Sequence, residues 1–91
     1  MKKDIAGTPS SFVLRVYRKG KKVQRYDTGK YLRFLHHTRL IKWQDASVYV
    51  KVNYHRELNR EGRMVSMHND MTCTSPADLK WAIRTFITEY V

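Results

Sequence analysis

Residues 11–27 read SFVLRVYRKGKKVQRYD, and apolar and polar side chains alternate on both sides of Lys19-Gly20. Alternation with a period of two is typical of a half-buried strand, and a glycine-containing turn between two such runs predicts an antiparallel β-hairpin. We therefore expect a basic β-hairpin here, around which the rest of the chain is organised.

The register of this hairpin determines which side chains share a face. A three-residue loop would place Arg15 opposite Arg25, and like charges directly opposite each other destabilise a sheet. We therefore prefer a two- or four-residue loop, which pairs Tyr17 with Lys22, Val16 with Val23, Arg15 with Gln24 and Val13 with Tyr26. The predicted core face carries Phe12, Leu14, Val16 and Val23, with Arg25 at its edge. The predicted opposite face carries Val13, Arg15, Tyr17, Lys22, Gln24 and Tyr26.

Positive charge is concentrated in one half of the chain. The sequence has 18 Lys and Arg against 8 Asp and Glu, which gives a formal net charge of +10 in 91 residues. Residues 1–45 account for +9 of this charge and residues 46–91 for +1. A need for solubility alone would spread the charge over the surface, so we expect a polyanionic partner that meets the N-terminal half.

Length and cysteine content limit the class of protein. A chain of 91 residues is long enough for one hydrophobic core, so we expect a single domain over residues 1–91, with residues 1–10 as a flexible arm. Cys73 is the sole cysteine, which fits a reducing compartment. The sequence has no apolar run of signal-peptide or membrane-spanning length. We therefore expect a cytoplasmic protein without membrane contact. The sequence also contains no internal repeat.

Residues 30–43 are ambiguous between helix and strand. Tyr31, Phe34 and Leu35 recur at helical spacing, and Thr28 could cap a helix that begins after it. This pattern favours a short helix, while a strand near residues 40–43 stays open.

A second hairpin is predicted in residues 48–73. Val48, Val50, Val52 and Tyr54 alternate with polar residues, and Asn59-Arg60-Glu61-Gly62 is a cluster of turn-forming residues. A turn centred on Arg60-Glu61 pairs apolar residues with apolar residues on one face of the hairpin and polar residues with polar residues on the other. The apolar pairs are Tyr54 with Met67, Val50 with Met71 and Val48 with Cys73. The polar pairs are Tyr49 with Thr72, Lys51 with Asp70, Asn53 with His68 and His55 with Ser66.

The C-terminal segment has the signals of a helix start. Ser75-Pro76-Ala77-Asp78 matches an N-cap serine, a proline at the first helical position and an acid at the third. An apolar stripe follows at Leu79, Ala82, Ile83, Phe86, Ile87 and Tyr90. We therefore predict an α+β fold in which two antiparallel hairpins form a small sheet on a C-terminal amphipathic helix, with a short helix between the hairpins.

The face of this sheet opposite the helix suggests a nucleic-acid-binding surface. Cations neutralise phosphates, and exposed aromatic rings stack on unpaired bases. One alternative is that the hairpin enters a DNA major groove as a two-stranded ribbon, with its tip, residues 18–22, on the backbone. Another is that tyrosines and lysines on this face are ordinary strand residues exposed to solvent. The residues predicted to bind DNA or RNA are Arg15, Tyr17, Arg18, Lys19, Lys21, Lys22, Arg25, Tyr26, Lys30, Arg33, Tyr49 and Lys51. No RNP sequence, GXXG loop or paired-cysteine finger is present, so the sequence indicates no known binding module.

Two other classes of function remain open. The chain could be a small inhibitor or adaptor, of the kind that phages and mobile elements encode, which docks on an acidic or nucleoprotein surface as an anti-CRISPR-type blocker does. Trp81 lies nearly opposite the apolar stripe of the C-terminal helix and would be its protein contact, or the contact of a homodimer. A small ribonuclease using His55 or His68 is a further alternative. Binding without catalysis or a cofactor is the primary expectation. No metal site is expected, because the histidines lack the spacing of a ligand set.

Overall fold

The computed structural model describes residues 9–58, 60–62 and 64–88, with side chains for all of these except 55–58, 64–66 and 88. The strands are β1 Pro9–Arg18, β2 Gln24–Thr28, β3 Ala46–Leu58 and β4 Met64–Cys73. The helices are α1 Tyr31–Thr38 and α2 Pro76–Ile83, and α2 continues into a π-helical turn, Arg84–Thr88. The predicted α+β class is confirmed.

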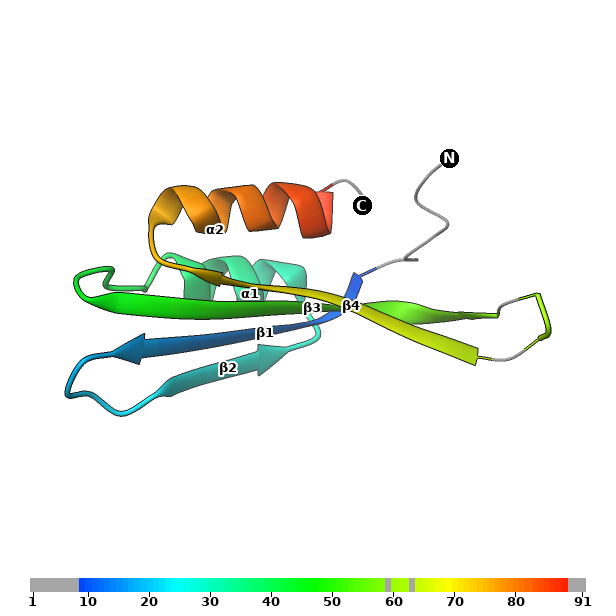
Figure 1. The fold of residues 1–91 in the computed structure, drawn as a ribbon, viewed down its shortest axis with the longest axis horizontal. Coiled ribbons are helices and arrows are strands. Elements are labelled where there is room, and N and C mark those ends of the chain that lie inside the picture. The colour runs from blue at the N-terminus through cyan, green and yellow to red at the C-terminus, as the bar shows by residue number, and fades with distance from the viewer. Residues whose placement is uncertain (1–8, 59, 63, 89–91) are drawn as a thin grey trace.

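The four strands form one antiparallel sheet in the order β2-β1-β3-β4 (Figure 1). The chain therefore runs twice through the same succession of hairpin and helix, and the first strands of the two ββα units, β1 and β3, pair at the centre. We call β1-β2-α1 with the loop that follows it, residues 9–45, the first unit, and β3-β4-α2 the second unit. This repeat of topology has no counterpart in the sequence.

Both helices pack on one face of the sheet. The buried core combines alternate strand residues with side chains of both helices, namely Phe12, Leu14, Val16, Phe34, Val48, Val50, Val52, Tyr54, Cys73, Leu79, Ala82, Phe86 and Ile87. The Tyr54 hydroxyl donates to the carbonyl oxygen of Phe86 at 2.8 Å and accepts from the Asn69 amide at 3.0 Å, which ties the sheet to the end of α2. The opposite face of the sheet has no helix in the described part of the chain.

The register of the first hairpin differs from the prediction by one residue. Val16 pairs with Gln24, Arg15 with Arg25, Leu14 with Tyr26 and Val13 with Asp27. A tight turn closed by the Lys21 N–H on the Arg18 carbonyl, with Gly20 at a φ of 73°, leads into residues 22 and 23, which lie outside the strands. Val23, expected in the core, is 37% exposed.

Tyr26 explains why this register is adopted. It lies on the helix-covered face, where it packs against the core and stacks on His37 of α1, with ring centroids 4.4 Å apart. The predicted register would have left this ring on the solvent side and buried the smaller Val23. Burial of the aromatic ring outweighs the repulsion between Arg15 and Arg25, because aromatic side chains contribute the largest apolar areas to a core.

The predicted pairing of the second hairpin is confirmed from Val48 with Cys73 to Tyr54 with Met67. The register then shifts between Tyr54 and Glu57, so Glu57 pairs with Val65, and the expected pairing of His55 with Ser66 falls in this irregularity. Figure 1 shows this hairpin extending past the other elements at one end of the molecule, opposite the end that carries the β1–β2 turn.

The ambiguous segment resolves into a short helix and a loop. α1 ends at Thr38, and residues 39–45 contain no strand. Thr28 is the last residue of β2, and its hydroxyl accepts a hydrogen bond from the Lys30 N–H at 3.1 Å. Pro9 and Ser10, which we expected in a flexible arm, begin β1, and the rest of that expected arm lies outside the described residues.

The helix start at Ser75 is as predicted. The Ser75 hydroxyl accepts from the Asp78 N–H at 3.3 Å, and Pro76 occupies the first turn. Among the described residues, the helices are too short and too polar to cross a membrane.

Candidate functional site

The open face is the side of the sheet that points away from both helices. Cross-strand pairing aligns its side chains in rows across the strands. Its described members are Ser11, Val13, Arg15, Tyr17, Arg25, Asp27, Ser47, Tyr49, Lys51, Asn53, His68, Asp70 and Thr72.

One of these rows contains two arginines and a tyrosine. Arg25 of β2 lies directly opposite Arg15 of β1, and Arg15 lies directly opposite Tyr49 of β3. The guanidinium carbon of Arg15 is 5.6 Å from the centroid of the Tyr49 ring, which is a cation–π arrangement. The Arg15 Nε is shielded from solvent and has no hydrogen-bond partner among the described residues. We call Arg15, Arg25 and Tyr49 the arginine row.

Tyr49 is itself held in place by a neighbouring strand. Its hydroxyl donates to Oδ2 of Asp70 on β4 at 2.9 Å. Burial, followed by this hydrogen bond to Asp70, raises the pKa of the Tyr49 phenol above its ordinary value. The ring is therefore neutral at physiological pH and positions the Arg15 guanidinium above the sheet.

The acidic side chains of the open face lie in a different row. Val13 pairs with Asp27 on one side and with Lys51 on the other, and Lys51 pairs with Asp70. Lys51 therefore faces an acid across the strands, whereas Arg15 and Arg25 face each other. The uncompensated positive charge of the face is in the arginine row, on the side of the β1–β2 turn.

Tyr17 connects the arginine row to that turn. It is two residues along β1 from Arg15, about 7 Å on the same face, and it is 41% exposed. An exposed ring beside a guanidinium plane provides two flat surfaces on which a base could stack.

The β1–β2 turn carries four cations. Lys19, Lys21 and Lys22 are exposed, while Arg18 is half-buried and donates from Nε to the Gln44 carbonyl at 3.4 Å. A hollow in the surface is lined by Arg18, Lys21, Lys22 and Gln24. Three cations around one hollow make a favourable position for a phosphate group.

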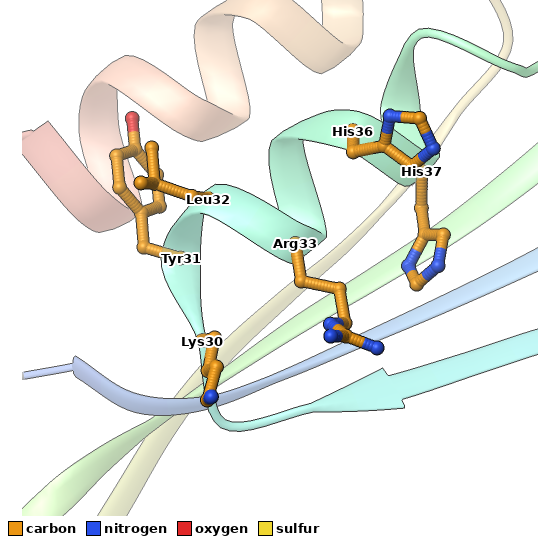
Figure 2. Close-up of a pocket in the computed structure, with 6 residues that line it drawn as sticks. All are labelled: Lys30, Tyr31, Leu32, Arg33, His36 and His37. Atoms are coloured by element: carbon orange, nitrogen blue, oxygen red, sulfur yellow. The ribbon is translucent and has the colours of Figure 1, made fainter.

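A second hollow lies on the outer side of α1. It is lined by Lys30, Tyr31, Leu32, Arg33, His36 and His37. Figure 2 shows the side chains of Lys30, Arg33 and His37 on one side of the helix and those of Tyr31 and Leu32 on the other. The stacking of His37 on Tyr26 identifies the first of these sides as the one next to β2.

Trp81 on α2 is 53% exposed. Its ring meets Phe86 edge-on, with centroids 5.9 Å apart and planes inclined by 78°. A shallow hollow beside it is lined by Ala77, Lys80 and Arg84.

The described residues contain no cluster of three His, Cys, Asp or Glu side chains that could hold a metal ion. Cys73 is buried in the core, and burial, with a smaller contribution from the Asp78 charge, raises the pKa of its thiol to about 11. The thiol is therefore protonated at neutral pH and serves packing. His68 lies on the open face opposite Asn53, and the side chain of His55 lies outside the described residues.

The residues predicted from the sequence fall into four places. Arg15, Tyr17, Arg25, Tyr49 and Lys51 share the open face, and Arg18, Lys19, Lys21 and Lys22 form the adjoining turn. Lys30 and Arg33 line the α1 hollow, and Trp81 is on α2. Three predicted positions were wrong: Tyr26 is on the helix-covered face, Arg25 is on the open face instead of at the edge of the core, and Lys22 lies in the turn instead of opposite Tyr17.

Sequence reasoning missed His36, His37, Leu32 and Tyr31 as lining residues of a hollow. The spacing of Lys30, Arg33 and His37 places all three on one side of a helix, and that signal was available once residues 31–38 were assigned as helical.

Comparisons with known protein families, with curated proteins and with solved structures found no significant match. The function is therefore argued from the site itself.

Proposed function

We propose that this protein binds nucleic acid through the open face of its first unit and the adjoining β1–β2 turn, as a binding module whose main contacts are with phosphates. The observation that carries this proposal is the pairing of Arg15 with Arg25 across the strands. Two like charges in that position destabilise the free protein, and an anion between them removes the repulsion.

The arrangement around the two arginines favours an anion from outside the protein. Asp27 and Asp70, the acids on the open face, lie in the neighbouring row. Tyr49 fixes the position of Arg15 before a ligand arrives, so less conformational freedom is lost on binding.

The extent of the basic surface favours a polymer over a single small anion. Positive side chains continue from the arginine row to the hollow lined by Arg18, Lys21 and Lys22, with Tyr17 between them. Residues 9–45 hold ten Lys and Arg against two Asp, so most of the molecule's charge belongs to the first unit. A chain of phosphates could occupy several of these positions at once.

The proposal is tested with the double variant Arg15→Gln, Arg25→Gln and labelled DNA and RNA oligonucleotides. Affinity for a single strand varies as about the −0.7 power of salt concentration per phosphate contact, so each lost contact should weaken binding about fivefold at 0.1 M salt. We expect a loss of about 25-fold for the double variant. Fluorescence anisotropy measures it.

The matched control is Lys80→Gln, Arg84→Gln, which removes two exposed cations from α2 and the π-helical turn that continues it. It should change affinity less than twofold, since the interface lies in the first unit. Equal losses in the two double variants would refute the open face as the interface and leave only a nonspecific effect of net charge.

A second candidate function is docking on a protein, supported by Trp81. A tryptophan that is half-exposed yet fixed against Phe86 resembles the rigid aromatic anchors of protein interfaces. Lys80 and Arg84 beside it favour an acidic partner, which fits an inhibitor or adaptor of a nucleoprotein. Failure of the wild-type protein to bind any oligonucleotide at low salt would favour this function over the first.

A further inference from the structure

The basic surface of the first unit continues past the open face to the other side of the sheet. Lys30 and Arg33 are exposed, belong to the α1 hollow, and extend from the side of the helix next to β2 (Figure 2). Arg25 lies on the open face, and its neighbour Tyr26 lies on the helix-covered face, where it contacts His37. One strand, β2, thus separates the arginine row from the α1 hollow.

This strand is at the edge of the sheet. β2 pairs with β1 on one side, and the sheet order ends with it on the other. It is five residues long, and Gln24, Arg25 and Asp27 are exposed along it. A ligand can therefore pass around β2 without meeting another element of the described chain.

We propose that the ligand is single-stranded nucleic acid that passes around the β2 edge, from the arginine row on the open face to the α1 hollow. Lys30 and Arg33 bind a phosphate there, and the exposed Leu32 contacts the adjoining sugar or base. Leu32 is 78% exposed, and burial of such a side chain under a nucleotide would be favourable. This inference rests on the proposed function of the open face.

The geometry selects a single strand over a duplex. Layers of secondary structure pack about 10 Å apart, so the ligand must reverse direction within roughly that distance. Double-stranded DNA has a persistence length of about 50 nm and would have to kink sharply to follow this path. A single strand bends freely at each nucleotide, so the path around β2 costs it little.

The types of side chain that line the α1 hollow suit single-stranded nucleic acid. The hollow combines two cations with apolar and aromatic side chains and two imidazoles, which is the mixture of groups that binds a phosphate together with an unpaired base. The Nδ1 of His37 is shielded and lacks a hydrogen-bond partner within the described residues, so the ring is held by its stacking on Tyr26.

The test compares oligonucleotides of about 4 and about 12 nucleotides, lengths within the range that small single-strand-binding domains cover. A four-nucleotide site has one register on the 4-mer and about nine on the 12-mer, so length alone can raise affinity about ninefold. In the wild-type protein, affinity should rise beyond this factor, because only the longer strand reaches both surfaces. In Lys30→Gln, Arg33→Gln the excess should disappear, and the salt slope for the 12-mer should become shallower by about 1.4.

The control variant Lys80→Gln, Arg84→Gln should keep both the rise and the slope. DNA and RNA strands of one sequence are compared in parallel, since the sugar that binds more tightly identifies the natural ligand. An undiminished rise in Lys30→Gln, Arg33→Gln would overturn the path around β2, as would a duplex that binds the wild type as tightly as the 12-mer.

Failure of this inference is distinguishable from failure of the proposed function. If only the path is wrong, the wild type still binds, and Arg15→Gln, Arg25→Gln still weakens binding. If the open face is not an interface, Arg15→Gln, Arg25→Gln weakens binding no more than Lys80→Gln, Arg84→Gln does.

Discussion

Arg25 influences folding and binding in opposite directions. It stands opposite Arg15 because the register is fixed by the burial of its neighbour Tyr26. The repulsion is therefore a cost to the free protein that a bound phosphate would remove. Departures from local rules of this kind are concentrated at functional sites.

Replacing Arg25 by Gln should stabilise the free protein and weaken its binding to nucleic acid. Like charges across strands cost about 0.2–1 kcal/mol, so Arg25→Gln should raise the free energy of unfolding by an amount in this range at low salt. The gain should shrink at high salt because the repulsion is screened. Urea denaturation at two salt concentrations measures the stability, and anisotropy measures the binding.

Lys51→Gln is the matched control on the same face. Lys51 lies opposite Asp70, so its removal should leave stability unchanged or lower it, and it should affect binding less than the loss of Arg25. If Arg25→Gln destabilised the protein as Lys51→Gln does, the arginine pair would not be a source of repulsion, and the main support for the proposed site would be lost.

At the scale of elements, the start of α2 is the clearest example of local chemistry that determines structure. Ser75 accepts from the Asp78 N–H, and the Asp78 carboxylate accepts from the N–H and hydroxyl of Thr74 at 3.0 and 3.2 Å. The hydrogen bond from the Thr74 backbone is the largest influence that lowers the pKa of Asp78 below its ordinary value.

The hydrogen bonds of Ser75 and of Asp78 at the start of α2 should respond differently to pH. Ser75→Ala should cost about 1 kcal/mol at any pH, because a hydroxyl does not titrate. Asp78→Asn should destabilise the protein at pH 7. A lowered pKa in the folded state means that the stabilisation is present above the unfolded pKa and is lost as pH falls through the folded value. The cost of Asp78→Asn should therefore shrink as the pH is lowered from 7 into the acidic range, as thermal melts can measure. A constant cost would contradict the role of the carboxylate.

The two hairpins differ in how much of their register the sequence determines. In the second hairpin, Val48 to Tyr54 alternate without interruption, and the polar pairs on the other face match as well, so one register satisfies both faces. In the first hairpin, the predicted register would leave the Tyr26 ring on the solvent side, and the observed register sets Arg15 opposite Arg25. The choice depends on α1, which supplies the His37 ring that Tyr26 contacts, and such a distant contact is not visible in local alternation.

Irregular features were also beyond the sequence pattern. The shift between Tyr54 and Glu57 lies where the alternation ends, since His55, Arg56 and Glu57 are all polar and such a run specifies the register only weakly. The π-helical turn after Ile83 places Phe86 beneath Trp81, five residues away, although the apolar stripe follows ordinary helical spacing. The helix start, by contrast, follows from local chemistry at Ser75, Pro76 and Asp78, and the fold class follows from the alternation in the two hairpins together with the apolar stripe of the helix.

At the scale of the whole molecule, the two units share a topology and differ in charge. Each unit is a hairpin followed by a helix, and β1 and β3 meet at the centre of the sheet. The sequence predicted the two hairpins and the uneven charge. The pairing of β1 with β3 joins residues 28 to 45 positions apart and could not be read from either strand. That pairing places Arg15 on Tyr49 and so completes the arginine row.

The most direct test of the account is a salt titration of the unmodified protein with a mixed-sequence single-stranded oligonucleotide of about 15 nucleotides. The cations of the open face, the turn and the α1 hollow amount to several phosphate contacts, each of which contributes about 0.7 to the slope of log K against log salt. We predict binding at low salt with a slope between about −2 and −5. A slope near zero, or no binding at the lowest salt, would contradict a nucleic-acid interface on the first unit.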